Sequence, residues 1–124
     1  MDYAITALKV IVGLSILNVW LVQYNKATRW RGGDAATIFE EFEVYGMPVW
    51  SVYVVGTLKV ILSVLLIVSI WYAALQLPAA VGLAILLAGS IAAHFKIGDP
   101  LIKSFPASLF LVMSVLIAYS ATGL

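Results

Sequence analysis

The sequence contains no cysteine, one histidine and few charged residues. Without cysteine the chain can form no disulfide bond, no thiolate nucleophile and no cysteine-held iron–sulfur cluster. A single histidine cannot build a zinc site or bind a haem from both faces, so we expect no metal and no covalently bound cofactor. The sequence also lacks the Ser-His-Asp order, the glycine-rich phosphate loop and the zinc-ligand spacings of known active sites. We therefore expect no catalytic activity from the chain on its own.

Charge is scarce, and its two signs are nearly balanced. Charged residues make up 10% of the 124 residues, where about 25% is usual in soluble domains. Seven Lys and Arg residues stand against six Asp and Glu residues, which gives no reason to expect a nucleic-acid partner. Hydrophobic residues reach 64% and the mean hydropathy is +1.09, which excludes both a soluble domain and a disordered chain. The composition is that of an integral membrane protein with the lipid bilayer as its first partner.

Four apolar runs are long enough to cross a bilayer core of about 30 Å. They cover about 4–24, 48–77, 79–95 and 105–122. Leu77-Pro78 predicts a very short turn between the second and third runs, because the residue before a proline avoids helical geometry. Short connections force neighbouring helices to run antiparallel. The predicted fold is therefore all-α, an up-down four-helix membrane bundle formed by residues 1–124 as a single domain.

The connection 25–46 holds seven of the thirteen formal charges. A pair of glycines can break the chain there, and Asp34 can cap a helix that follows. Apolar side chains on one face and acidic ones elsewhere are typical of a helix at the membrane surface, and the apolar face would consist of Ile38, Phe39 and Phe42. We predict an interfacial helix over about 34–43.

Lysine and arginine are concentrated in two of the connections. Cytoplasmic loops carry the excess of these residues in membrane proteins. We therefore predict that loops 25–46 and 96–104 are cytoplasmic and that both termini lie outside, in what we expect to be the cytoplasmic membrane of a prokaryote. The basic residues concerned are Lys26, Arg29, Arg31, Lys96 and Lys103.

Small residues are expected to bring the helices together, because the hydrophobic effect does not drive association within lipid. The run at 79–95 has alanine at every fourth position, which predicts a stripe buried against a neighbouring helix. The alternative is that this run is simply rich in alanine. The stripe consists of Ala80, Ala84, Ala88 and Ala92, with Gly89 beside it. Gly13 and Gly56 give weaker signals of the same kind.

Tryptophan and tyrosine occur mainly near the ends of the predicted spans, as Trp20 and Tyr45 do. This placement is typical of an aromatic belt, in which the rings lie at headgroup depth. We expect anchoring from these residues rather than stacking on a ligand.

An ionisable side chain inside a membrane is costly, and it is therefore a functional candidate that needs a partner. Lys59 begins the most apolar stretch, on the side of the membrane where the acidic helix returns. A pair with Glu41 or Glu43 would hold the interfacial helix against the bundle, whereas in the alternative the Lys59 ammonium reaches water by snorkelling. For Lys9, inside the first span, we expect snorkelling toward the outer headgroups.

His94 lies at the end of the third span, on the same side of the membrane as Lys59. An imidazole there can relay a proton or donate a hydrogen bond to a quinone carbonyl. The alternative is a polar helix-end group paired with a carboxylate. Asp99 precedes Pro100 and is expected to cap a short turn. The predicted polar cluster at one membrane face consists of Lys59, His94, Glu41, Glu43 and Asp99.

Three segments carry a family resemblance. They are Tyr45-Gly46-Met47-Pro48, Gly56 with Lys59, and His94-Phe95-Lys96-Ile97-Gly98-Asp99-Pro100 followed by Lys103 and Pro106-Ala107. In these segments the chain resembles the DoxX-like family of small membrane proteins, from about residue 25 to the C-terminus. The resemblance implies a four-helix membrane bundle. The family's names come from a subunit associated with a terminal quinol oxidase and a thiosulfate:quinone oxidoreductase, and other relatives resemble chaperones or accessory factors.

Three functions follow as hypotheses. The first is an accessory or scaffold subunit of a larger membrane protein complex, with other membrane subunits as partners. The alternative is a quinone-interacting component of a membrane oxidoreductase, with His94, Lys59 and a carboxylate lining a pocket that takes a quinone or a lipid. The third hypothesis is a small transporter that works as a homo-oligomer. It is the weaker alternative, because the sequence offers no repeat and no helix broken at mid-span, which are the usual signs of a transport site.

Overall fold

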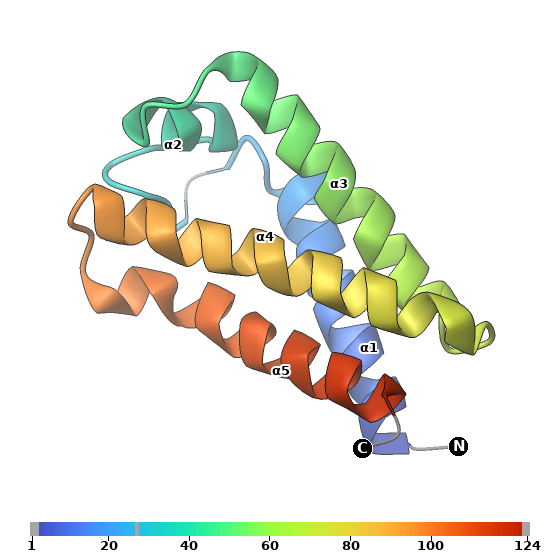
Figure 1. Ribbon diagram of the computed structural model, residues 1–124. Coiled ribbons are helices and arrows are strands. Elements are labelled where there is room, and N and C mark those ends of the chain that lie inside the picture. Colours follow the sequence, from blue (N-terminus) through green and yellow to red (C-terminus); the bar gives the residue numbers. More distant parts are fainter. Residues whose placement is uncertain (1–2, 27, 123–124) are drawn as a thin grey trace.

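Residues 3–26 and 28–122 are described by a computed structural model, and they form helices and connections with no strand (Figure 1). Four segments are long and apolar enough to cross a membrane, namely Tyr3–Val22, Val49–Val68, Ala73–Lys96 and Leu101–Ala121. They contain the helices α1 (Tyr3–Leu17), α3 (Val49–Val68), α4 (Gln76–Lys96) and α5 (Phe105–Ala121). The shorter elements are the π-helical turn η1 (Asn18–Val22), α2 (Ile38–Val44) and the 3-10 turns η2 (Ala73–Leu75) and η3 (Leu101–Ser104). The predicted all-α four-helix membrane bundle is confirmed.

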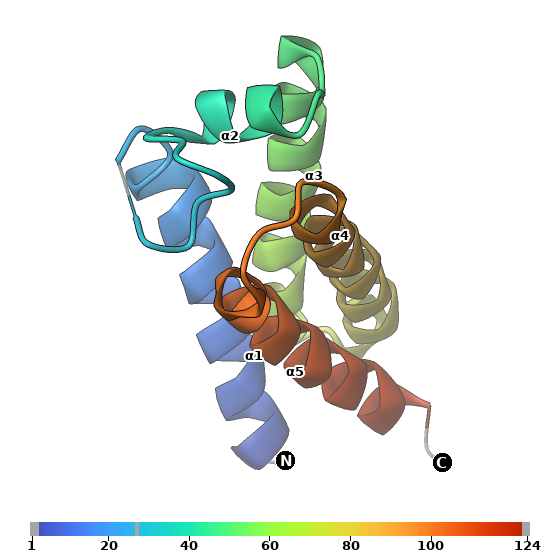
Figure 2. The ribbon, with the colours of Figure 1, turned by 90° about the vertical axis from the view of Figure 1, so that its left-hand side faces the viewer.

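The bundle has two unlike ends. The described ends of the chain lie together at one of them, and α2 with the two charged connections lies at the other (Figure 1). Helices α3 and α4 meet near the turn that joins them and diverge toward the second end (Figure 1). Helix α2 lies across that second end, beyond the end of α1 and beside the start of α3 (Figure 2). This divergence leaves room inside the bundle under α2.

The second and third spans differ from the sequence prediction at the turn between them. Helix α3 ends at Val68 and α4 begins at Gln76, so the predicted spans 48–77 and 79–95 are wrong at this turn. Pro78 lies in the first turn of α4, where its missing N–H would be unpaired in any case, and so it does not break the helix. The Gln76 side chain donates to the carbonyl oxygen of Ile117 and to the hydroxyl of Ser120, both at 2.8 Å, and ties the start of α4 to α5.

The interfacial helix is shorter than predicted and begins later. Helix α2 starts after Thr37, whose hydroxyl accepts a hydrogen bond from the Glu40 N–H at 3.1 Å. Thr37 and Glu40 have the spacing of a capping box, and this pair starts the helix in place of Asp34, which is exposed. The predicted range 34–43 is therefore wrong at its start. The inner face of α2 carries Ile38 and Phe42, which are buried in a small core with Tyr45 and Val52.

The predicted alanine stripe is not the packing face of α4. Of its four alanines Ala80 alone is buried, Ala84 is half-buried, and Ala88, Ala92 and Gly89 are exposed. An α-helix turns by about 100° per residue, so positions four apart drift around the axis by about 40° at each step. From Ala80 onward the buried positions follow a mean spacing of 3.5 residues, which keeps one face inward. The buried residues of α4 are Gln76, Ala79, Ala80, Leu83, Leu87 and His94.

Gly13 makes a close approach between α1 and α3. A Cβ atom at this position would lie 2.6 Å from Cγ1 of Ile67 and 3.2 Å from the carbonyl oxygen of Ser63. Neighbouring side chains, among them Val12 and Leu66, belong to the main apolar core of the spans. The absence of a side chain therefore lets the two helices pack at this point.

We predict that Gly13→Ala destabilises the bundle while Gly89→Ala does not. Overpacking costs about 1–3 kcal/mol, and an alanine in a helix otherwise gains about 1 kcal/mol over glycine. A Cβ at Gly89 meets nothing within 4 Å, so this substitution is the matched control. Thermal unfolding in detergent, followed by circular dichroism, should give a lower midpoint for Gly13→Ala alone. Equal midpoints for the two variants would contradict the close packing.

Candidate functional site

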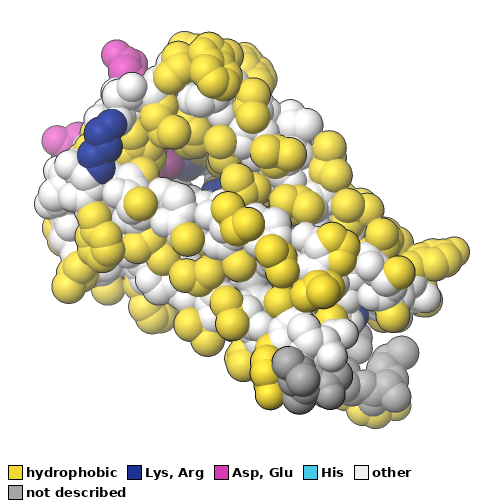
Figure 3. Space-filling model, viewed as in Figure 1, with side chains coloured by type: hydrophobic (Ala, Val, Ile, Leu, Met, Phe, Trp, Pro, Cys, Tyr) yellow, Lys and Arg dark blue, Asp and Glu magenta, His cyan; other side chains and the backbone are white. Residues whose placement is uncertain are grey.

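A cavity of about 320 Å³ lies inside the bundle under α2. This volume falls in the range of about 300–1,000 Å³ that is usual for small-molecule sites. Figure 3 shows a hollow in the apolar surface at the α2 end, with Lys or Arg and Asp or Glu atoms visible inside it. The walls are largely apolar, and the polar side chains that line them are Gln23, Thr28, Arg31, Glu41, Tyr45, Lys59, Ser90, His94 and Lys103. Such a cavity can hold an apolar molecule that carries a few polar atoms.

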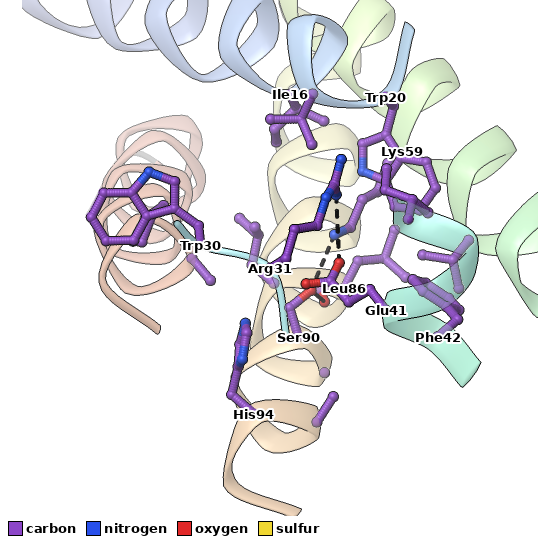
Figure 4. Close-up of a pocket in the computed structure, with 18 of the residues that line it drawn as sticks. Ile16, Trp20, Trp30, Arg31, Glu41, Phe42, Lys59, Leu86, Ser90 and His94 are labelled. Atoms are coloured by element: carbon purple, nitrogen blue, oxygen red, sulfur yellow. Dashed lines mark hydrogen bonds and ion pairs between the residues drawn. The ribbon is translucent and has the colours of Figure 1, made fainter. Parts of the chain in front are cut away.

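Lys59 reaches this cavity from the middle of α3 (Figure 4). Its residue is 7% exposed, and its Nζ donates to the hydroxyl of Ser90 on α4 at 3.1 Å. The same Nζ lies 5.4 Å from the centre of the Trp20 ring, a cation–π contact. An ammonium has three N–H donors, and within the described residues Ser90 is the hydrogen-bond acceptor found for it. Lys59 thus brings spare donors to the cavity.

Glu41 and Glu43 do not pair with Lys59, contrary to one of the two expectations. Glu41 lies on the inner side of α2 and pairs with Arg31, with 3.6 Å between its Oε1 and Nη1 (Figure 4). Glu43 is exposed, because it lies two residues further around the helix. Snorkelling of Lys59 is also wrong, since the side chain is buried in the centre of its span rather than at the edge.

Arg31 fixes the connection that covers the cavity. It is buried, and its Nη2 donates to the carbonyl oxygens of Gln23 at 2.6 Å and Lys26 at 3.2 Å. These carbonyls follow the last helical turn of the first span, and the ion pair with Glu41 then ties them to α2. In the sequence Arg31 is one of several loop charges, and its place in the site was not predicted.

His94 is held between Asp99 and Tyr45. Its Nδ1 lies 2.7 Å from Oδ2 of Asp99, and its Nε2 lies 3.4 Å from the hydroxyl of Tyr45. The expected partnership of His94 with a carboxylate is therefore present. Asp99 does not cap the following turn, contrary to expectation, because its two oxygens bind His94 and the N–H of Gly33 at 3.1 Å. Pairing thus fixes the His94 ring on the cavity wall.

The electrostatics of this group follow from burial and its partners. Burial alone would raise the pKa of Asp99, but the hydrogen bonds from His94 and Gly33 and the charge of Lys103 outweigh it and lower that pKa. Burial, followed by the negative charge of Glu41, raises the pKa of Tyr45. Tyr45 therefore keeps its hydroxyl proton as a donor, and Asp99 stays ionised.

Arg31 and the two glycines that follow it form a strap, residues 31–33, at the cavity. The Gly32 N–H donates to Glu41 at 2.5 Å, and the carbonyl oxygen of Gly33 accepts from Lys103 at 2.5 Å. Gly33 has φ +55, and a Cβ on Gly32 would lie 2.6 Å from the Tyr45 ring. Glycine is needed at both positions, the first for space and the second for its left-handed backbone. The sequence prediction of a simple chain break missed this role.

Lys9 lies outside the site. It is buried, and its Nζ donates to the carbonyl oxygen of Ser69 at 3.3 Å. The expected snorkelling is wrong because Ser69, the residue that follows the end of α3, presents its carbonyl oxygen at the negative end of the helix dipole to this ammonium. Lys9 therefore stabilises the end of the bundle opposite α2.

Three aromatic residues assigned to the membrane belt, Trp20, Trp30 and Tyr45, line the cavity. Trp20 lies on the π-helical turn η1, packs edge-on against Phe42 with 6.0 Å between ring centres, and lines the cavity. Tyr45 is buried against His94. The signal that could have found Trp20 is Gly56, where a Cβ would lie 2.8 Å from the Trp20 ring. Predicting that contact requires the pairing of the two helices.

The fold and the cavity define a class, a small membrane protein built as a four-helix bundle with a largely apolar pocket that contains a few polar side chains. Residues 27–117 match the family model of the DoxX-like family. The chain belongs to this family and is an integral membrane protein. Searches of curated proteins and of solved structures found no match.

We predict that Asp99→Asn lowers stability near neutral pH and weakens its dependence on acid. The carboxylate makes hydrogen bonds of a charged group, each worth about 1.5–3 kcal/mol. Because the folded pKa of Asp99 is lowered, its stabilisation is present above the ordinary pKa of about 3.9 and is lost as the pH falls from there through the lowered value.

The measurement is the unfolding midpoint in detergent at a series of pH values. Asp34→Asn, at an exposed carboxylate, is the control and should follow the wild-type curve. A wild-type curve for Asp99→Asn as well would mean that the His94–Asp99 pair contributes nothing to the fold.

Proposed function

We propose that the chain is a quinone-binding accessory subunit of a larger membrane oxidoreductase, with the quinone ring in the cavity under α2. The observation that carries this proposal is the buried Lys59 ammonium, which faces a largely apolar cavity with spare hydrogen-bond donors. Membership of the DoxX-like family is in keeping with this proposal, because names in that family come from a subunit associated with quinone-linked enzymes. The proposal joins the first two functions considered from the sequence.

The ring of a quinone is flat and carries carbonyl oxygens on opposite sides, and these oxygens accept hydrogen bonds. Lys59 provides spare N–H donors at one part of the cavity, where Ser90 accepts one hydrogen bond from it and donates its own proton to the carbonyl oxygen of Leu86. The paired side chains of Tyr45 and His94 line another part. Ser90 and His94 are four residues apart on α4, which is about 6 Å along the axis. Trp20 offers an aromatic wall for the ring. The Lys59 donors in a largely apolar cavity therefore suit an apolar ring that carries an acceptor oxygen.

Electrons would come from a partner subunit. The chain has no cysteine and one histidine, so it does not carry the ligands by which iron–sulfur clusters and bis-histidine haems are held. Quinone reduction also takes up protons, and the His94–Asp99 pair lies on the cavity wall where a proton could be supplied. With the predicted orientation, this end of the bundle faces the cytoplasm.

We expect Lys59→Met to weaken quinone binding about tenfold or more, because a hydrogen bond from a charged donor is worth about 1.5–3 kcal/mol. Lys9→Met is the matched control, since Lys9 is also a buried lysine in a span but lies outside the cavity. Quenching of tryptophan fluorescence by menadione in nanodiscs measures the affinity. Equal affinities of wild type and Lys59→Met would refute the proposed head-group site.

The accessory part of the proposal has a separate test. Extraction from native membranes in mild detergent should recover the chain with a stoichiometric membrane partner and with quinone. Recovery of the chain only as a free monomer or homodimer would contradict an accessory role and would leave quinone binding to the fluorescence measurement.

A further inference from the structure

The cavity under α2 opens sideways between α3 and α4. Four apolar residues from these two helices line it on this side, namely Val55, Ile85, Leu86 and Gly89. Ile85 is 66% exposed and Gly89 is exposed, and a Cβ on Gly89 would meet nothing within 4 Å. Figure 3 shows the hollow on this face, bordered by hydrophobic side chains. A cavity wall that is both exposed and free of charge marks an opening rather than a packed seam.

This opening lies within the hydrocarbon. Gly89 belongs to the apolar span Ala73–Lys96 and precedes its charged end by seven residues, which is about 10 Å along the helix. The water-facing end of the cavity is covered by α2 and by the strap, which Glu41, Asp99 and Lys103 hold in place through hydrogen bonds. Lipid therefore has a more direct route to Lys59 than water has.

We propose that this gap at Gly89 is a lateral entrance for a lipid-soluble ligand that enters head first and leaves a linear apolar tail between α3 and α4. The inference rests on the proposed function, and it adds a ligand class: tailed quinones in preference to tailless ones. Gly89 is then a specificity-determining residue, because the missing side chain is the space through which the tail leaves the cavity.

The chemistry of the two ends of this route supports the choice of ligand. The inner end has the N–H donors of Lys59, whereas the outer end has the aliphatic side chains of Val55, Ile85 and Leu86. A head group that carries oxygen atoms gains hydrogen bonds at the inner end. A hydrocarbon tail has no polar groups to leave unpaired, so it can remain in the apolar gap without cost. A ligand that is charged or polar along its whole length would leave polar groups unpaired at the entrance.

The test compares phylloquinone with menadione, which share one naphthoquinone ring and differ by the phytyl tail. Gly89→Leu places a side chain in the gap, and it should not disturb folding because leucine is a better helix former than glycine and the space is open. Ala88→Leu is the matched control, because it adds the same side chain at an exposed neighbour that does not line the cavity. Quenching of tryptophan fluorescence in nanodiscs gives both affinities, and circular dichroism checks the fold.

We expect wild type and Ala88→Leu to bind phylloquinone more tightly than menadione. Gly89→Leu should weaken phylloquinone binding about tenfold, equivalent to about 1.4 kcal/mol, and leave menadione binding unchanged. An unchanged affinity of Gly89→Leu for phylloquinone, or an equal loss for both quinones, would overturn the lateral entrance while the head-group site stands. Failure of the wild type to bind either quinone would instead overturn the proposed function.

Discussion

The interaction on which the site depends is the burial of one lysine ammonium at mid-span. A charge in the hydrocarbon is costly unless other groups solvate it, and Lys59 is met by the neutral hydroxyl of Ser90 and by the face of the Trp20 ring. Ser90 lies on α4 and Trp20 on the π-helical turn η1, so both partners come from neighbouring elements. The carboxylate of Glu41 balances Arg31 instead. The direct contacts of Lys59 are therefore neutral, and the negative charge of Glu41 acts on it without forming an ion pair with it.

The other charges of the site hold the cover of the cavity in place. Two carboxylates, on Glu41 and Asp99, accept from successive backbone N–H groups of Gly32 and Gly33. The same carboxylates pair with Arg31 and His94, so each one joins the strap to a different part of the bundle. Closure at the aqueous side thus uses paired charges, whereas the wall that faces lipid uses aliphatic side chains. The water-facing end of the cavity is therefore covered, whereas the side that faces lipid is open.

Hydropathy and length predicted the four spans, because the cost of unpaired backbone groups in lipid leaves helices as the available structure. Hydropathy and length could not predict where the turn near Pro78 lies, because proline occurs both in the first turn of a helix and at a break between helices. The prediction of a buried alanine stripe was wrong because residues spaced four apart move gradually around the helix axis and do not stay on one face. In the site, the sequence indicated Lys59, Glu41 and His94 as polar candidates. It could not give Ser90 as the partner of Lys59, since that contact joins residues 31 positions apart on two helices, nor distinguish Arg31 from the other loop charges.

The pairing pattern also bears on the charge of a ligand. A lone ammonium attracts an anion as well as a neutral acceptor, but an anion must be stripped of water before it crosses a lipid-facing opening, at a cost of several kcal/mol or more. A neutral carbonyl loses far less on the same route and still accepts a hydrogen bond from Lys59. The lateral opening thus acts as a selective barrier before the site is reached, and the lysine is left to discriminate among neutral molecules by their acceptor oxygens. The outer end of the cavity thus selects ligands by their solubility in lipid, and the inner end selects them by their hydrogen-bond acceptors.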